Sequence, residues 1–147
     1  MIILDTTVLS YAVGEAHPLR EPCRRLLEAH GSGRIEATTT VEVIQEFVHV
    51  RSRRRTRTDA VALARHYVAA FRLLVSDEDD LARGLTLFAR HPALGAFDAV
   101  LAAVALNRKA DWLVSADQAF GEASELRWID PATPPLDRLI GNAPRRG

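Results

Sequence analysis

The chain has 147 residues, enough for one domain with a sizeable core. Its 19 basic and 19 acidic side chains balance, so bulk charge does not favour a general nucleic-acid binder, and any polynucleotide contact must be local. A single cysteine, Cys23, excludes a disulfide framework and a cysteine-based zinc site. Because the sequence has neither an apolar run of about 18 residues nor a signal-like start, we expect a soluble, cytoplasmic protein without membrane contact.

The first half of the chain predicts two strands, each followed by a helix. Met1 to Leu4 is a short apolar run, typical of a buried parallel strand, and it ends in Asp5. The elements expected next are a helix over Leu19 to His30, a strand over Ile35 to Thr38, and a helix capped by Thr39 or Thr40.

The helix capped by Thr39 or Thr40 carries two acids on its polar face, and a basic run follows them. Glu42 and Glu46 lie one turn apart, and a solvated face with a weak ion pair explains Glu42 as well as a site does, but Glu46 less well. The run from Arg51 to Arg57 holds five arginines. Solvation or pairing with acids elsewhere, and contact with phosphate or a partner, both remain open for this run.

The middle and the end of the chain continue the alternation. We expect a helix carrying the apolar positions Val61 to Leu74 and then a strand over Leu73 to Val75. Ser76 and Asp79 resemble a capping box that starts the next helix, and a last strand is expected over Arg127 to Ile129. The Pro-rich tail from about Pro131 is expected to be peripheral. No linker or repeat divides the chain, so residues 1–147 are treated as one domain.

The stretch from Phe97 to Phe120 organises these elements. It begins with a helical pattern that has Asp98 in its first turn, continues into a short strand over Trp112 to Val114, and then reaches Ser115 and Asp117. Either acid alone has an ordinary explanation, since helix starts and turns both favour aspartate. A functional interpretation requires that several carboxylates converge.

The predicted topology brings most of these acids together. Alternating strands and helices predict an α/β fold in which helices cover both faces of a central parallel sheet. The carboxyl ends of parallel strands share one edge, where ligands bind in such sheets. Asp5, Ser115 and Asp117 therefore lie at that edge, whereas Asp98 joins them only if its helix points inward.

Clustered carboxylates repel one another unless a cation neutralises them. Mg²⁺ suits this arrangement, because it takes oxygen ligands together with waters and substrate phosphates, and such an ion can activate a water for attack on a phosphodiester. The histidine spacing does not fit a zinc centre, and we expect no histidine to be placed as a general base.

Four segments resemble the PIN-domain ribonucleases, and among them the VapC-type toxins of bacterial toxin–antitoxin pairs. They are the opening strand with Asp5-Thr6-Thr7, the helix from Thr40 with Glu46 at the sixth position after the cap, FDAVLAAVAL, and LVSAD followed by Phe120. By this resemblance the catalytic and metal-binding acids are Asp5, Glu46, Asp98 and Asp117, with Thr6, Ser115 and Glu42 in supporting positions. Glu42 departs from the family pattern and competes with Glu46 for its role.

The resemblance implies a single PIN-like domain and a Mg²⁺-dependent endoribonuclease, with Mn²⁺ as a substitute. It also implies an RNA substrate, a cognate VapB-type antitoxin and a homodimer. Two alternatives remain: a receiver-like signalling domain, which lacks support because Asp5 is followed by threonines and Lys109 precedes the fourth strand, and a PIN fold that only binds a partner.

Overall fold

The computed structural model describes residues 1–141. Within them, four short strands form one parallel sheet in the order β2-β1-β3-β4. The strands are β1 (Ile2–Leu4), β2 (Ala37–Thr38), β3 (Trp112–Val114) and β4 (Trp128–Ile129). In the central register, Ile3 pairs with Thr38 on one side and with Leu113 on the other.

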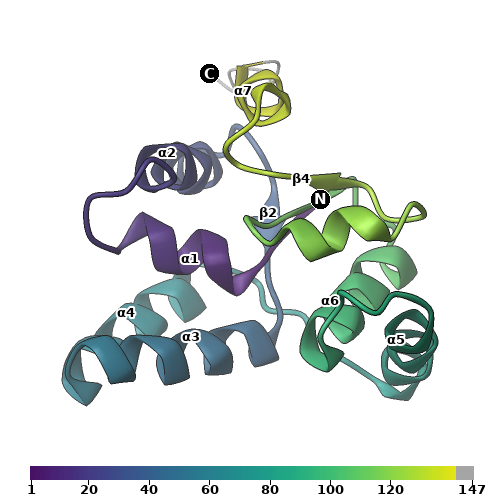
Figure 1. Cartoon of the computed structure of the whole chain (residues 1–147). Coiled ribbons are helices and arrows are strands. Elements are labelled where there is room, and N and C mark those ends of the chain that lie inside the picture. Colours follow the sequence, from purple (N-terminus) through teal and green to yellow (C-terminus); the bar gives the residue numbers. More distant parts are fainter. Residues whose placement is uncertain (142–147) are drawn as a thin grey trace.

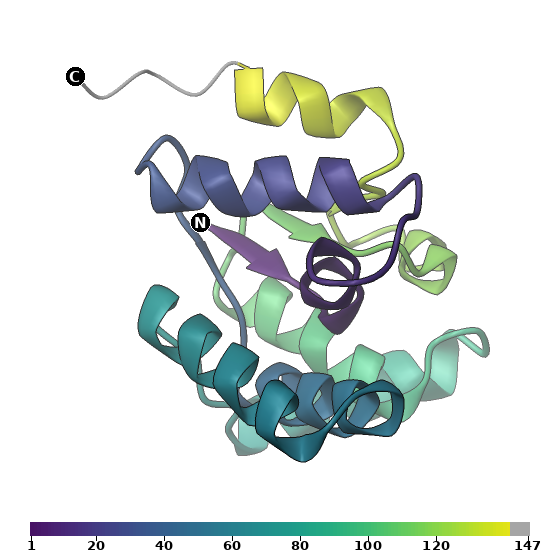
Figure 2. The ribbon, with the colours of Figure 1, turned by 90° about the vertical axis from the view of Figure 1, so that its left-hand side faces the viewer.

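Helices cover both faces of this sheet, as the sequence predicts (Figure 1). They are α1 (Thr6–Ala12), α2 (Arg20–Gly31), α3 (Val41–Arg54), α4 (Arg57–Ala70), α5 (Glu78–Arg90), α6 (Ala96–Asn107) and α7 (Pro134–Gly141), with the 3₁₀ helix η1 (Gln118–Glu122). Figure 2 shows α2 on one side of the strands and α6 on the other. None of the helices in residues 1–141 has the length and hydropathy needed to cross a membrane.

The two central strands, β1 and β3, are short apolar runs that are buried on both faces. Ile3, Leu4, Leu113 and Val114 are fully buried, because helices lie above and below them.

The start of α3 is fixed by a side-chain cap: the Thr40 hydroxyl accepts a hydrogen bond from the Val43 amide at 3.2 Å. Thr39 instead donates to the Leu4 carbonyl at 2.7 Å and ties the end of β2 to β1.

Three predicted elements in the middle of the chain are wrong in detail. Leu73 to Val75 is not a strand of the sheet, because only Leu74 forms a bridge, to Thr40. Helix α4 ends at Ala70, before that segment. The capping box of α5 uses Asp77 and Asp80, one residue later than the predicted pair, because Asp80 is the residue whose buried side chain can reach back to the Asp77 amide.

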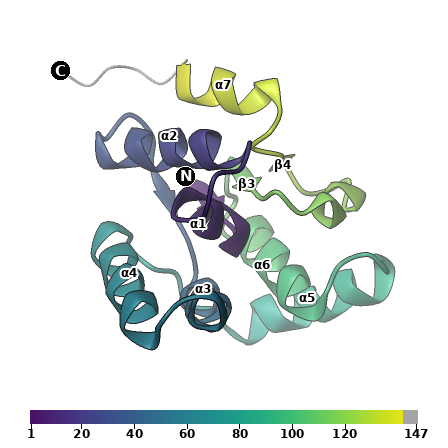
Figure 3. The ribbon, with the colours of Figure 1, turned by 60° about the vertical axis from the view of Figure 1, so that its left-hand side comes forward.

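The expectation of a peripheral tail is wrong for residues 131–141, and residues 142–147 lie outside the described part of the chain. Helix α7 packs against α2, as Figures 1 and 3 show. Leu136 and Ile140 bury its apolar side, and Arg25 of α2 pairs with Asp137 at 2.7 Å. The apolar spacing of these two residues, four apart, identifies a helix face that the prolines obscured.

The crossing of α5 and α6 is unusually close at one glycine (Figure 3). Gly84 is buried, and a Cβ atom on it would lie 2.8 Å from Cγ2 and 2.9 Å from Cα of Val100. Val100 follows Asp98 by two residues on α6. Helix α5 therefore packs directly against the first turns of α6, next to its acid.

Candidate active site

Asp5 stands at the carboxyl end of β1 and caps α1. Its Oδ2 accepts hydrogen bonds from the Thr7 amide at 3.3 Å, the Thr7 hydroxyl at 2.8 Å and the Ser115 hydroxyl at 2.7 Å. The side chain is buried, but among the described residues its Oδ1 has no donor. One oxygen is thus fixed by the protein, and the other is left for a ligand.

The loop after β3 is joined to the loop after β1 by the same hydroxyls. Ser115 Oγ accepts from the Asp117 amide at 3.0 Å, and Thr7 Oγ1 accepts from the Ala116 amide at 3.0 Å. Asp117 then caps η1 by accepting from the Ala119 amide at 2.9 Å, and its side chain stays exposed. These bonds place Asp117 beside Asp5, as the sheet topology predicts.

Glu46 reaches the same place from the middle of α3. Its Oε2 accepts a hydrogen bond from the Thr6 hydroxyl at 2.7 Å, so the first residue of α1 orients an acid forty positions away. Ser115 and Thr6, expected as supporting hydroxyls, each contact one acid. Thr7 was not among the predicted site residues, although its place two positions after a helix-capping aspartate is a signal for such a contact.

A cavity of about 440 Å³ brings the four acids together, and we call it the acid cavity. It is lined by Asp5, Glu46, Asp98 and Asp117. Burial, followed by the charges of the other three acids, raises the pKa of Asp98 from 3.8 to about 7. The first turn of α6 therefore points inward, which the order of strands and helices alone does not determine.

Glu42 is not part of the acid cavity. It is exposed one turn before Glu46 and lines a neighbouring groove of about 670 Å³, together with Asp98 and the exposed ring of Phe97. Glu46, Asp5 and Asp98 also line this groove, so Glu46 borders both spaces and Glu42 only the groove. One histidine, His17, also lines the acid cavity.

The raised pKa of Asp98 makes the stability of the metal-free protein depend on pH. The folded state holds this proton more tightly than the unfolded state, so the stabilising contribution is complete below pH 3.8 and is lost as the pH rises to about 7. Each pKa unit is worth about 1.4 kcal/mol, which amounts here to a few kcal/mol.

We therefore compare the melting temperatures of wild-type protein and Asp98→Asn, both in chelator, at pH 5 and at pH 7.5. Between these two values the melting temperature of the wild type should fall relative to that of Asp98→Asn. The difference between the two proteins cancels the titration of the histidines. Parallel melting curves for the two proteins across this range would show that Asp98 is not the perturbed group.

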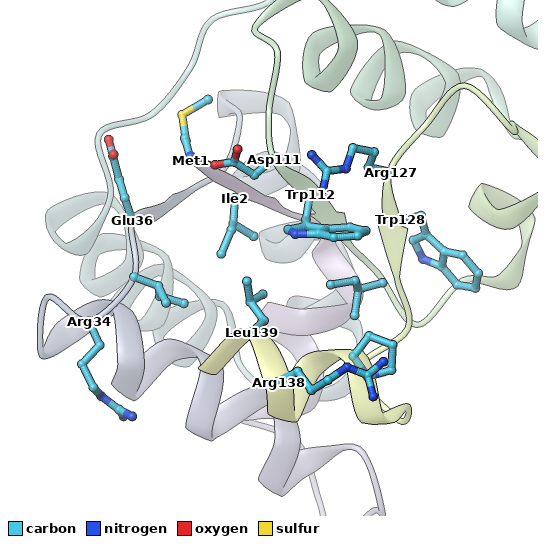
Figure 4. A pocket seen from close by; sticks show the side chains of 13 residues that line it. Met1, Ile2, Arg34, Glu36, Asp111, Trp112, Arg127, Trp128, Arg138 and Leu139 are labelled. Atoms are coloured by element: carbon cyan, nitrogen blue, oxygen red, sulfur yellow. Dashed lines mark hydrogen bonds and ion pairs between the residues drawn. The ribbon is translucent and has the colours of Figure 1, made fainter. Parts of the chain in front are cut away.

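A second cavity, of about 740 Å³, lies at the opposite edge of the sheet, where the strands begin (Figure 4). Figure 4 shows Arg127 beside the ring of Trp112, at 4.3 Å from its centroid. None of the four acids lines it. Although it is larger, it lies away from the carboxyl edge where ligands bind in sheets of this kind.

The donors of the acid cavity suit a hard divalent cation. In residues 1–141, no three His, Cys, Asp or Glu side chains are spaced to hold a metal ion by direct contact alone. Mg²⁺ does not require this, because it binds through one or two carboxylates and keeps several waters. The mutual repulsion that raises the pKa of Asp98 is what a bound cation would relieve.

The fold and the site define an α/β protein with a carboxylate-lined cavity at the carboxyl edge of a parallel sheet. The model of the PIN domain matches residues 2–126, and the chain belongs to the PIN-domain family. This membership excludes the receiver-like alternative. PIN-domain ribonucleases in general depend on divalent metal ions.

Known proteins similar to this chain include ribonucleases and toxins of the VapC group. Ribonuclease VapC7 of Mycobacterium tuberculosis is 54% identical over 144 residues, which cover 97% of this chain and 99% of that protein. The structure of M. tuberculosis VapC20, a toxin that cleaves the sarcin-ricin loop, matches with a TM-score of 0.72 at 19% identity, over 84% of this chain and 95% of that one. Rickettsia felis VapBC2, solved bound to a promoter DNA fragment, matches with a TM-score of 0.71 at 16% identity, over 88% and 98% of the two chains.

Proposed function

We propose that this chain is a Mg²⁺-dependent endoribonuclease that acts as the toxin of a toxin–antitoxin pair. The convergence of four carboxylates on one cavity carries the proposal. The near full-length similarity to a ribonuclease of the VapC group supports the reaction, the hydrolysis of RNA phosphodiester bonds.

Each of the four acids has its own role in the proposed metal site. Asp5 and Asp98 hold the ion, Glu46 completes or orients its shell, and Asp117 positions a water or a second ion. When bound, Mg²⁺ neutralises the carboxylates and supplies a water of lowered pKa for attack. The hydroxyls of Thr6 and Ser115 keep Glu46 and Asp5 in fixed orientations, so the site needs little rearrangement.

We propose a VapB-type antitoxin as the partner that keeps the acids inactive in the cell. The simplest inhibitor is an arginine of that partner, paired with the carboxylates in a charge-assisted and often bidentate contact. Solved structures of similar fold include toxin–antitoxin complexes, which supports such a partner.

A homodimer is also part of the proposal. Leu81, Leu85 and Phe88 are exposed by 50%, 58% and 47%, and their spacing places them along one side of α5. A stripe of exposed apolar side chains on one helix supports an interface with another chain.

The direct test is cleavage of a structured RNA by the purified protein, with Mg²⁺ and with chelator. The proposal requires internal cuts that depend on the ion, with Mn²⁺ as a working substitute. Metal binding without cleavage of any RNA would favour the alternative, a PIN fold that only binds a partner.

Metal binding should also stabilise the fold, because it relieves the repulsion among the acids. At about 100 times its dissociation constant, a divalent ion adds roughly 2.7 kcal/mol to the free energy of unfolding. We expect melting curves at pH 7.5 to shift upward with Mg²⁺ or Mn²⁺ relative to chelator. An unchanged melting temperature at millimolar metal would contradict a metal site in the acid cavity.

A further inference from the structure

A fifth acid, Glu15, also lines the acid cavity and pairs with Arg55, and the remaining wall of the cavity has a different chemistry. Tyr11 from α1, His17 from the following loop and Arg54 from the end of α3 line it. We propose that these three residues form a subsite for one nucleotide of single-stranded RNA, with the base on the aromatic rings and a phosphate at Arg54. This inference rests on the proposed ribonuclease function and extends it to the way the substrate is held.

The two aromatic side chains of this subsite, Tyr11 and His17, stack on each other. The rings of Tyr11 and His17 lie 4.6 Å apart between centroids, at an interplanar angle of 30°. His17 Nδ1 accepts a hydrogen bond from the Leu19 amide at 3.1 Å, which fixes the ring and leaves Nε2 to carry the proton of the neutral form. Because His17 is exposed and Tyr11 covers one of its faces, the other face can take a third ring.

Arg54 differs from its neighbours in the basic run. Arg51 is held by both carboxylate oxygens of Asp59, at 2.6 and 3.3 Å, and Arg55 pairs with Glu15 at 3.2 Å. Arg54 is exposed, lines the acid cavity and has no carboxylate within 4.0 Å in the described part of the chain. Its charge is therefore available to a ligand of this cavity.

A nucleotide combines the two features that this wall recognises. Aromatic side chains bind unpaired bases by stacking with little sequence preference, and arginine binds phosphate. An RNA strand is repelled by four carboxylates, so a positive charge in the same cavity offsets part of that repulsion. A strand whose phosphodiester is cleaved at the acids places a neighbouring nucleotide near them, and Tyr11, His17 and Arg54 line the same cavity as the acids.

The test measures steady-state cleavage of a single-stranded RNA oligonucleotide at saturating Mg²⁺. His17→Ala should raise KM about 10-fold, within the range found when a stacking side chain is removed, and His17→Phe should restore it. Arg54→Gln should raise KM several-fold and lower the slope of log KM against log salt by about one. Arg53→Gln is the matched control, since Arg53 is exposed on the same turn but does not line the cavity.

Two results would overturn the subsite. One is a KM that stays the same in His17→Ala and Arg54→Gln. The other is a collapse of kcat at constant KM in both His17→Ala and His17→Phe, which would make His17 a general base instead of a stacking surface. Melting curves of each variant identify any loss of fold.

A failure of the proposed function gives a separate result. If wild-type protein cleaves no RNA, the affinity for the same oligonucleotide is measured by fluorescence anisotropy in chelator. Weaker binding by His17→Ala, restored in His17→Phe, supports the subsite without catalysis. Equal affinities overturn it.

Discussion

Replacing Asp98 with asparagine should abolish RNA cleavage and make the metal-free protein more stable. The change keeps the shape of the side chain but removes a charge that burial and three neighbouring acids disfavour. Cleavage should fall by more than about 100-fold, the upper end for loss of an outer partner in a metal site. Initial rates with Mg²⁺ and melting curves in chelator at pH 7.5 measure both effects.

Asp5→Asn should lose activity equally but with little change in stability. The amide oxygen can accept the bonds that Oδ2 now accepts from Thr7 and Ser115, and only the free oxygen is lost. Asp79→Asn is the control for Asp98→Asn, because Asp79 is likewise a first-turn acid but is exposed and does not line the acid cavity. If Asp98 were only a helix-start residue, Asp98→Asn would stay active, as Asp79→Asn should.

Glu46→Gln should also abolish cleavage, whereas Glu42→Gln should reduce it modestly. Glu46 lines the acid cavity and is oriented by the Thr6 hydroxyl, while Glu42 lies outside that cavity. The glutamine at 46 can keep the bond from Thr6, so the loss isolates the charge. Initial rates at saturating Mg²⁺ compare the two variants, and the reverse order would mean that the acid one turn earlier does the work.

The site residues that come directly after a strand could be predicted from the sequence. Asp5, Ser115 and Asp117 come directly after β1 and β3, and parallel pairing alone puts strand ends on one edge. The inward direction of Asp98 depends on how α6 packs against α5, which local pattern does not specify. His17 lies in a loop, and its stack on Tyr11 arises from tertiary structure that periodicity cannot reveal.

The errors in the fold have similar causes. Leu73 to Val75 has the composition of a strand, but its only bridge in the structure joins Leu74 to Thr40, so composition was an insufficient guide to pairing. The prolines of the tail suggested a peripheral segment, yet Pro134 begins α7, a position where proline is well tolerated.

The crossing at Gly84 means that the acids alone do not decide whether a chain of this kind is active. A methyl group there has no room against Val100, so α5 and α6 must separate, and any part of that shift taken up by α6 moves Asp98 with it. We therefore expect that one substitution at Gly84 could weaken the toxin while every acid stays in the sequence. Inactive descendants of such a protein would still carry the full set of acids, and helix spacing would distinguish them from active ones.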